Sequence, residues 1–151
     1  MNSTDLMKPT TEEISISKEW SSSLFSSDLS NLAFSFLYDG NLSSDLIESW
    51  QLNQFAEQLD KFRKRHSLVL FDSETGLELQ CLLTEYTDYP ALEWVVFFEN
   101  KGDDVTPIIS DAQVADLTFS AKDTGNFILH HAEGSHARIT DFQPQSEVLV
   151  P

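Results

Sequence analysis

The sequence is poor in the features that stabilise a protein without a packed core or attach it to a membrane. It contains one cysteine, Cys81, so no disulfide can form within the chain, and cysteine usage does not indicate a redox compartment. No apolar run approaches the roughly 18 residues that a membrane-spanning helix needs. The first residues also lack a basic leader followed by an apolar stretch, so we expect no signal peptide and no membrane partner. The compartment, cytoplasmic or exported, stays open.

Basic residues are scarce as well. The chain has 9 Lys and Arg against 25 Asp and Glu, which gives a formal net charge of −16 at pH 7. A field of that sign repels phosphate groups, and the one basic cluster, within residues 61–65, is too short to offset it. The charge therefore argues against nucleic acid as a partner. It permits a neutral partner such as a carbohydrate without favouring one, and solubility is the simpler explanation.

Apolar residues are present in the amount that one folded domain needs. They make up 40% of the 151 residues, and 11 residues are Phe. Residues 92–99 show the period-two alternation of a strand with one buried face, which is carried by Leu92, Trp94, Val96 and Phe98. Residues 67–71 and 77–85 flank the turn at 72–76 and predict a β-hairpin, with Cys81 at a core position.

The spacing of turns and strands predicts the fold class. Further strands are expected at residues 108–111, 115–121 and 126–131, with turns at residues 100–104 and 122–126. Residues 146–150 form either another short strand or the start of a linker. Short strands divided by Gly, Asp and Asn turns favour an all-β, two-sheet antiparallel β-sandwich over βαβ units. One or two short helices complete this prediction.

Three segments depart from the strand pattern. Residues 1–19 are polar and aperiodic and are interpreted as a flexible N-terminal arm, so that the sandwich domain covers residues 20–151. Ser43 or Ser44 can cap a short helix that runs to Trp50. In residues 51–66 the apolar positions fit a helix better than a strand; they are Leu52, Phe55, Leu59 and Phe62.

Four blocks of sequence, in order, resemble the amino-terminal β-sandwich domain of bacterial family 36-type α-galactosidases. Residues 34–40, with 43–50 behind them, are similar to that family's Phe-Ser-Phe-x-Tyr-x-Gly opening, and residues 72–78 to its Asp-x-x-Thr-Gly-Leu-Glu turn. Residues 89–108 resemble its Pro-Ala-Leu-Glu-Trp-Val strand, which runs through Phe-Glu-Asn-x-Gly into Thr-Pro-Ile. Residues 129–144 resemble its Leu-x-His-x-x-Gly-Ser stretch. The resemblance covers about three-quarters of the chain, residues 34–144.

The resemblance implies a supersandwich-like accessory domain that packs on a (β/α)₈ catalytic barrel. It also implies an extended conformation for residues 51–66. Retaining α-galactosidases use two carboxylates about 5–5.5 Å apart, and in the family both belong to the barrel. The implied partners are therefore the downstream barrel and a galactoside-type carbohydrate, with no cofactor, and we expect this chain alone to be inactive. A free-standing carbohydrate-binding module, or an oligomerisation domain that forms a homo-oligomer, remains the alternative.

Four residues are candidates for binding substrate. In the family interpretation the loop from residue 130 to 141 faces the barrel, where His131, Ser135 and Asp141 offer groups that hydrogen-bond sugar hydroxyls. Trp50, like Trp20, lies in a less regular segment and could stack on a sugar.

Other polar residues predict no site. A triad of Ser135, His131 and Asp141 lacks a nucleophile elbow. Metal binding by His130, His131 and His136 is not expected, because neighbouring side chains in a strand point to opposite faces. Four carboxylates are interpreted as solvated surface groups: Glu85, Asp88, Asp103 and Asp104.

Overall fold

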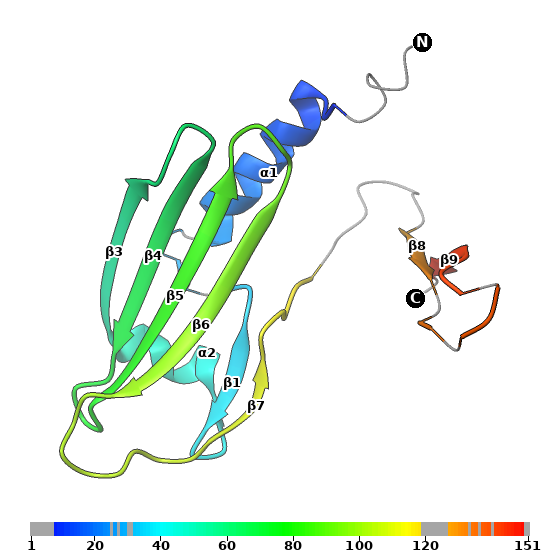
Figure 1. Ribbon diagram of the computed structural model, residues 1–151. Coiled ribbons are helices and arrows are strands. Elements are labelled where there is room, and N and C mark those ends of the chain that lie inside the picture. The colour runs from blue at the N-terminus through cyan, green and yellow to red at the C-terminus, as the bar shows by residue number, and fades with distance from the viewer. Residues whose placement is uncertain are drawn as a thin grey trace. The chain divides into compact units, whose positions relative to one another are not determined.

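The computed structural model describes residues 8–24, 26, 28–29, 32–118, 127–132, 134–135, 137–139 and 141–149. It divides the chain into two compact units, Met1–Leu117 and Thr118–Pro151. Within the described residues the chain forms nine strands in three antiparallel sheets (Figure 1). The predicted all-β, sandwich-like fold is confirmed. No helix in this part of the chain is long and apolar enough to cross a membrane.

The larger unit holds two of the three sheets. Its four-stranded sheet has the order β3-β4-β5-β6, and its three-stranded sheet has the order β2-β1-β7. In chain order the elements of this unit are α1 (Thr11–Leu24), β1 (Ser35–Tyr38), β2 (Asn41–Leu42), α2 (Ser43–Leu46), the 3-10 helix η3 (Ile47–Ser49), β3 (Gln51–Gln58), β4 (Arg63–Phe71), β5 (Leu77–Tyr86), β6 (Leu92–Asn100) and β7 (Ile109–Gln113).

The predicted hairpin is the β4–β5 connection. The Asp72 amide donates to the Leu77 carbonyl at 2.9 Å, and the Thr75 hydroxyl donates to Asp72 Oδ2 at 2.6 Å. Gly76 has φ +79°, a left-handed conformation that glycine adopts at little cost. These bonds fix the register between β4 and β5, in which Phe71 lies opposite Glu78. The apolar positions of β5 therefore lie on the same face of the sheet as those of β4.

Residues 51–66 form β3, a turn at 59–62 and the start of β4, so apart from the turn they are extended, as the resemblance implied and against their helical spacing. All eight residues of β3, which is an edge strand of the sheet, are exposed. Pairing with β4, from Gln51 opposite Phe71 to Gln58 opposite Lys64, supplies backbone hydrogen-bond partners along its length. Tertiary pairing therefore overrides the local helical pattern here.

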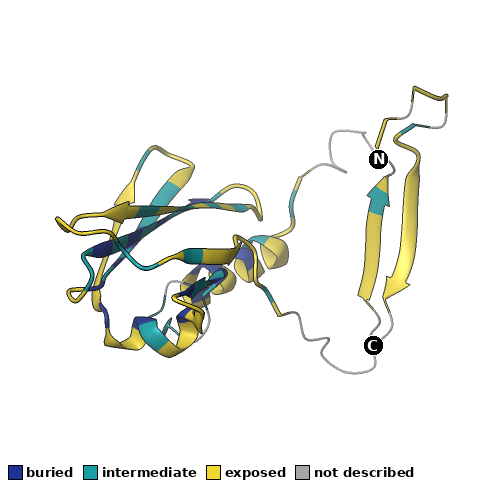
Figure 2. Ribbon diagram, turned by 90° about the horizontal axis from the view of Figure 1, so that it is seen from below, coloured by how far each residue is buried: buried dark blue, intermediate teal, exposed yellow. Residues whose placement is uncertain are grey.

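The core lies between the four-stranded sheet and the layer that contains β1 and the short helices (Figure 2). Phe36 of β1 packs edge-on against Phe98 of β6 at 5.1 Å between ring centroids. Buried and partly buried residues alternate from Leu68 to Phe71 of β4 and from Leu77 to Leu83 of β5, as a one-sided sheet requires. The core cluster comprises Phe34, Phe36, Tyr38, Ile47, Trp50, Leu68, Leu70, Leu77, Leu79 and Cys81.

The short helix predicted before Trp50 is present as α2 followed by η3. The predicted cap by Ser43 or Ser44 is wrong, because Leu42 occupies the N-cap position and no side chain caps α2. Ser43 Oγ instead accepts a hydrogen bond from the Phe36 amide at 3.2 Å. This bond ties the start of α2 to β1 within the core.

Helix α1 corrects the expectation of a flexible arm over residues 1–19. Residues 1–7 lie outside the described residues, but Thr11–Leu24 is helical. Thr10 and Glu13 form a reciprocal capping box: the Thr10 amide donates to Glu13 Oε2 at 2.7 Å, and the Glu13 amide donates to Thr10 Oγ1 at 3.2 Å. The helix buries Ser17, Ser21 and Leu24, and Leu24 packs with Leu83 of β5.

The smaller unit contains β8 (Phe127–Ala132) and β9 (Pro144–Leu149). They pair antiparallel, from Phe127 opposite Leu149 to Ala132 opposite Pro144. The sequence had predicted one domain over residues 20–151, but these two strands pair with each other and form their own sheet. The expected turn at 122–126 and part of the strand at 115–121 lie outside the described residues.

Candidate functional site

The loop after β8 brings two of the predicted sugar-binding residues together. The Ser135 hydroxyl donates to Asp141 Oδ2 at 3.1 Å, and the Arg138 amide donates to the same oxygen at 2.8 Å. Ala137 in this loop has φ +60°. The carboxylate of Asp141 therefore closes the loop by accepting hydrogen bonds from the Ser135 side chain and the Arg138 backbone amide. Ser135 and Asp141 thus bond to each other within this loop.

His131 lies on β8 and contacts a different carboxylate. Its Nε2 is 3.4 Å from Oε1 of Glu147 on β9, although the buried Nε2 has no hydrogen bond of good geometry. The neighbouring His130 shares a hydrogen bond of 2.8 Å with the Ser146 hydroxyl. The two histidines therefore contact different residues of β9, His131 contacting Glu147 and His130 contacting Ser146. His136 lies outside the described residues, and the part of the chain that is described holds no group of three or more His, Cys, Asp or Glu suited to a metal ion.

Trp50, the fourth predicted residue, is a core residue. Its exposed fraction is 8%, and its ring lies edge-on to Tyr38 at 5.7 Å and tilted against Phe36 at 6.4 Å. The indole packs against these core rings and has no face exposed at the surface on which a sugar could stack. Its position after η3, where the chain enters β3, carries it into the core.

Glu85 corrects the interpretation of the turn carboxylates as surface groups. It is 7% exposed, and its Oε2 accepts a hydrogen bond from the Ser21 hydroxyl at 3.0 Å and lies 3.0 Å from His66 Nε2. This cluster joins α1 to β4 and β5. Asp88, Asp103 and Asp104 are exposed, as predicted.

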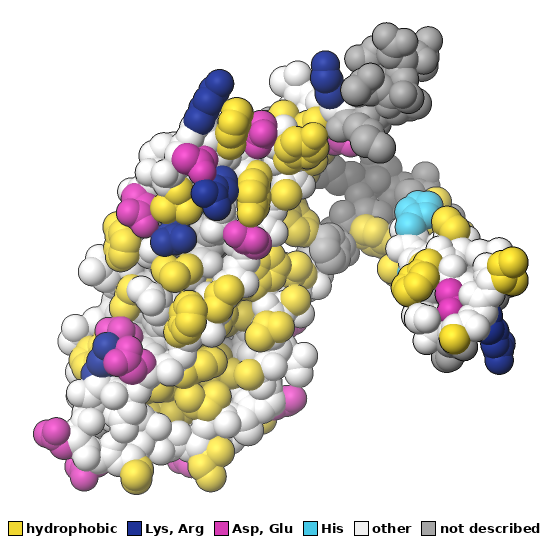
Figure 3. Space-filling model, in the orientation of Figure 1, with side chains coloured by type: hydrophobic (Ala, Val, Ile, Leu, Met, Phe, Trp, Pro, Cys, Tyr) yellow, Lys and Arg dark blue, Asp and Glu magenta, His cyan; other side chains and the backbone are white. Residues whose placement is uncertain are grey.

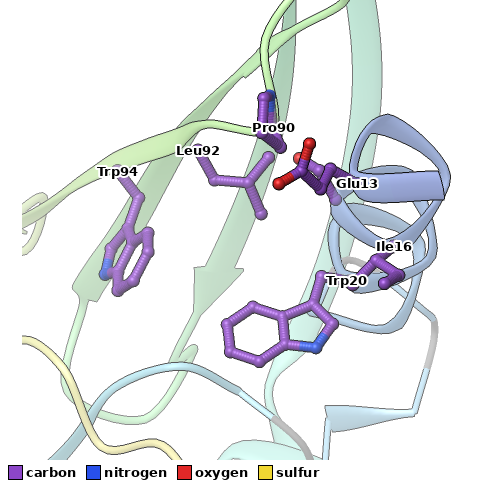
Figure 4. A pocket seen from close by; sticks show the side chains of 7 residues that line it. Glu13, Ile16, Trp20, Pro90, Leu92 and Trp94 are labelled. Atoms are coloured by element: carbon purple, nitrogen blue, oxygen red, sulfur yellow. The ribbon is translucent and has the colours of Figure 1, made fainter. Parts of the chain in front are cut away.

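The structure also holds a cavity of about 380 Å³ between α1 and β6, which we call the α1–β6 pocket (Figure 4). Side chains from the amino-terminal turns of α1 face Leu92 and Trp94 of β6, with Pro90 preceding the strand. Five of the seven lining residues are apolar: Ile16, Trp20, Pro90, Leu92 and Trp94. The other two are Glu13 and Ser17.

Each wall of the α1–β6 pocket follows from the period of its element. Glu13, Ser17 and Trp20 recur at helical spacing and share one face of α1. Leu92 and Trp94 alternate on the inner face of β6, since Trp94 lies opposite the buried Leu83. The Trp94 indole N–H donates to the Val114 carbonyl at 2.7 Å, which fixes the ring.

The two polar residues of the α1–β6 pocket differ in their bonding. Ser17 is 8% exposed, and its Oγ is buried without a hydrogen-bond partner among the described atoms. Glu13 accepts both Thr10 bonds at Oε2, and these hydrogen bonds lower the pKa of its carboxyl below the ordinary 4.5. Glu13 is therefore ionised at neutral pH, whereas the buried Ser17 hydroxyl has no hydrogen-bond partner in the described structure.

Sequence reasoning considered Trp20 but missed the rest of this pocket. The signal that could have found α1 is the Thr10-x-x-Glu13 capping box behind Pro9, followed by Ile16, Trp20 and Leu24 at every fourth residue. The serines between them hid the apolar face. The alternation of residues 92–99 places Trp94 on the inward face of the strand, as the structure shows. The same pattern does not indicate that α1 lies across the pocket from Trp94.

The fold and these sites define a mostly β protein in which a sandwich-like unit carries a helix-lined pocket and is followed by a separate two-stranded unit. No family model, curated protein or solved structure matches this chain.

Proposed function

We propose that this chain is the non-catalytic amino-terminal β-sandwich domain of an α-galactosidase-like glycoside hydrolase. It packs on a (β/α)₈ catalytic barrel, and the loop that carries Ser135 and Asp141 lines the sugar pocket of that barrel. The proposal comes from the four blocks of family resemblance. The observation that supports a packing role is an apolar outer face on the four-stranded sheet.

The outer face follows from the register of β3 to β6. One row across the sheet consists of Phe55, Ser67, Leu82 and Val95, and the next consists of Asn53, Val69, Gln80 and Phe97. Phe55, Val95 and Phe97 are each about half exposed. Figure 3 shows hydrophobic side chains gathered over the strands of this sheet. We call the set Phe55, Val69, Leu82, Val95 and Phe97 the outer-face patch.

An apolar outer face is unusual for an antiparallel sheet that faces water, where polar residues normally alternate with buried ones. Contiguous exposed apolar surface with a polar rim marks interaction sites. The rim here carries the ion pairs Arg65–Glu57 and Lys101–Glu99. This combination suits a rigid body that docks against a larger partner through its sheet.

A non-catalytic role agrees with the setting of Glu85, which is one of two buried carboxylates among the described residues, the other being the turn residue Asp72. A retaining glycosidase needs two carboxylates that reach opposite sides of a sugar. Glu85 is instead bonded to Ser21 and His66, across the junction of α1 with the sheet. We expect the purified chain to give no turnover of a chromogenic α-galactoside, and measurable turnover would overturn the proposal.

The coding DNA after codon 151 gives the most direct test. We expect it to encode a (β/α)₈ barrel of the α-galactosidase type. A coding region that stops there, or that continues into an unrelated domain, would refute the proposed function.

The role of the outer-face patch is tested by co-expressing the chain with that barrel. We expect the two to copurify, and the double variant Val95→Ser/Phe97→Ser to reduce the complex at least tenfold, since each serine removes roughly 1 kcal/mol or more of apolar burial. The matched control Val105→Ser/Ile108→Ser removes two apolar side chains from an exposed loop of the same unit. Equal loss of complex in both double variants would show that the patch is not the docking surface.

A further inference from the structure

We propose that the α1–β6 pocket binds small organic ammonium ions that carry an apolar group. The site is separate from the outer-face patch, and this proposal does not depend on the function proposed above. It rests on three observations: the two indole rings, the buried hydroxyl of Ser17 and the carboxylate of Glu13.

The walls of the pocket can contact both the apolar group and the positive charge of such a ligand. Trp20 from α1 and Trp94 from β6 contribute indoles to one cavity, which Leu92 and Pro90 also line (Figure 4). Indole faces attract cations more strongly than other aromatic side chains do. A cavity of about 380 Å³ is within the range of small-molecule sites, roughly 300–1,000 Å³.

Ser17 supplies a directional contact. Its Oγ is buried and unpartnered in the described structure, which leaves the desolvation cost of that hydroxyl without compensation. An ammonium N–H donor in the pocket would pair with this oxygen. The ligand would therefore satisfy a polar atom that the fold leaves without a bond.

Charge selects a cation over an anion or a neutral molecule. Glu13 lines the same cavity, and its hydrogen bonds with Thr10 keep its pKa low and its carboxylate ionised. The net charge of −16 adds a field of the same sign. A sugar ring presents several hydroxyls, whereas the described residues of this lining include two polar side chains, Glu13 and Ser17, so a carbohydrate would leave most of its hydroxyls unpaired.

The test titrates the full chain with phenethylammonium and follows tryptophan fluorescence. We expect saturable quenching that weakens as salt is added, because exposed charge interactions are screened. The neutral isostere 2-phenylethanol and the sugar methyl α-galactoside serve as comparison ligands. We expect both to bind at least about fivefold more weakly than phenethylammonium.

Single substitutions separate the contributions of the pocket residues. Glu13→Gln keeps a residue that can close the capping box but removes the charge, and should weaken phenethylammonium about fivefold. The matched control Glu12→Gln removes an equal charge from the same helical turn, outside the pocket lining, and should change affinity less than about twofold. Ser17→Ala should weaken binding without lowering stability, because the hydroxyl has no partner to lose.

Three outcomes would overturn the proposal. Equal affinity for 2-phenylethanol would mean that the pocket recognises apolar surface alone. Tighter binding of methyl α-galactoside would identify a carbohydrate site instead. No saturable quenching by phenethylammonium, in a chain whose far-ultraviolet circular dichroism shows the folded state, would mean that the cavity does not bind this class of ligand.

Discussion

Among the glycines that the structure describes, Gly76 has the least room for a side chain. A Cβ built at this position would lie 2.7 Å from both the Cα and the amide nitrogen of Gly102. The Lys101 amide also donates to the Gly76 carbonyl at 2.8 Å. The β4–β5 turn and the segment after β6 are therefore packed backbone against backbone, and a methyl group has no flexible neighbour to displace.

Substituting Gly76 with alanine should lower the free energy of unfolding by more than the strain of a left-handed alanine alone. We expect Gly76→Ala to lower the free energy of unfolding by about 2–4 kcal/mol, the sum of conformational strain and overpacking. Gly40→Ala is the matched control, because Gly40 has φ +77° and a Cβ added there would meet nothing within 4 Å. That control should lose only about 1 kcal/mol. Urea denaturation of both variants measures the difference, and equal losses would contradict the close approach.

Among single residues, the sequence predicted the positions that local rules govern. The Gly76 turn and the inward face of Trp94 follow from turn chemistry and period-two alternation. The burial of Trp50 did not follow, because it depends on Phe36 and Tyr38 of β1 covering the ring. Ser17 was also missed, since a hydroxyl on a buried helical face carries no hydrophobic signal.

Helix α1 depends on its capping box more than on its composition. It contains six serines and threonines after Thr10 and few strong helix formers, so its intrinsic propensity is low. Thr10 and Glu13 satisfy amides of the first turn that would otherwise lack partners. The first turn should therefore respond to substitutions at the cap.

We predict that Thr10→Ala destabilises α1 by about 1 kcal/mol, the usual cost of losing such a cap. The Thr10 hydrogen bonds lower the pKa of Glu13 in the folded state, so its contribution to stability is present above pH 4.5 and is lost as the pH falls through the lower, folded pKa. Amide hydrogen exchange in the first turn of α1 measures both effects. Exchange that is unchanged between about pH 6 and about pH 3, after correction for the intrinsic rate, would contradict this role of Glu13.

The elements also show where sequence patterns mislead. The apolar residues of 51–66 have helical spacing, yet the chain there is an edge strand and a turn because β4 supplies its hydrogen bonds. In α1 the reverse holds: a serine-rich segment that was expected to be a flexible arm is helical, and Leu24 and Ser21 dock on β5. In both cases a neighbouring element, distant in sequence, determines the conformation.

For the whole molecule, the core belongs to the first unit. Among the described residues, the two buried clusters consist of residues between Leu24 and Leu83, with partly buried neighbours that extend to Leu117. The described residues of β8 and β9 are exposed apart from His131, and they pair in a two-stranded sheet of their own. Two-stranded hairpins are marginally stable by themselves. The free energy of unfolding should therefore reside in the first unit.

We predict that a chain ending at Leu117 keeps cooperative thermal unfolding, with a Tm within about 4 °C of the full chain, a difference below about 1 kcal/mol. A chain ending at Gly102 is the control. It also removes β7, whose pairing with β1 places Ser110 opposite Leu37 and Ile109 opposite Tyr38, and so exposes one edge of the sheet that carries Phe36. We expect that shorter chain to lose its cooperative transition, because β1 then keeps only β2 as a strand partner within its sheet. Circular dichroism during heating distinguishes the two. If the chain ending at Leu117 also melts without a transition, the core requires residues of the second unit, and the division into two units fails as a description of stability.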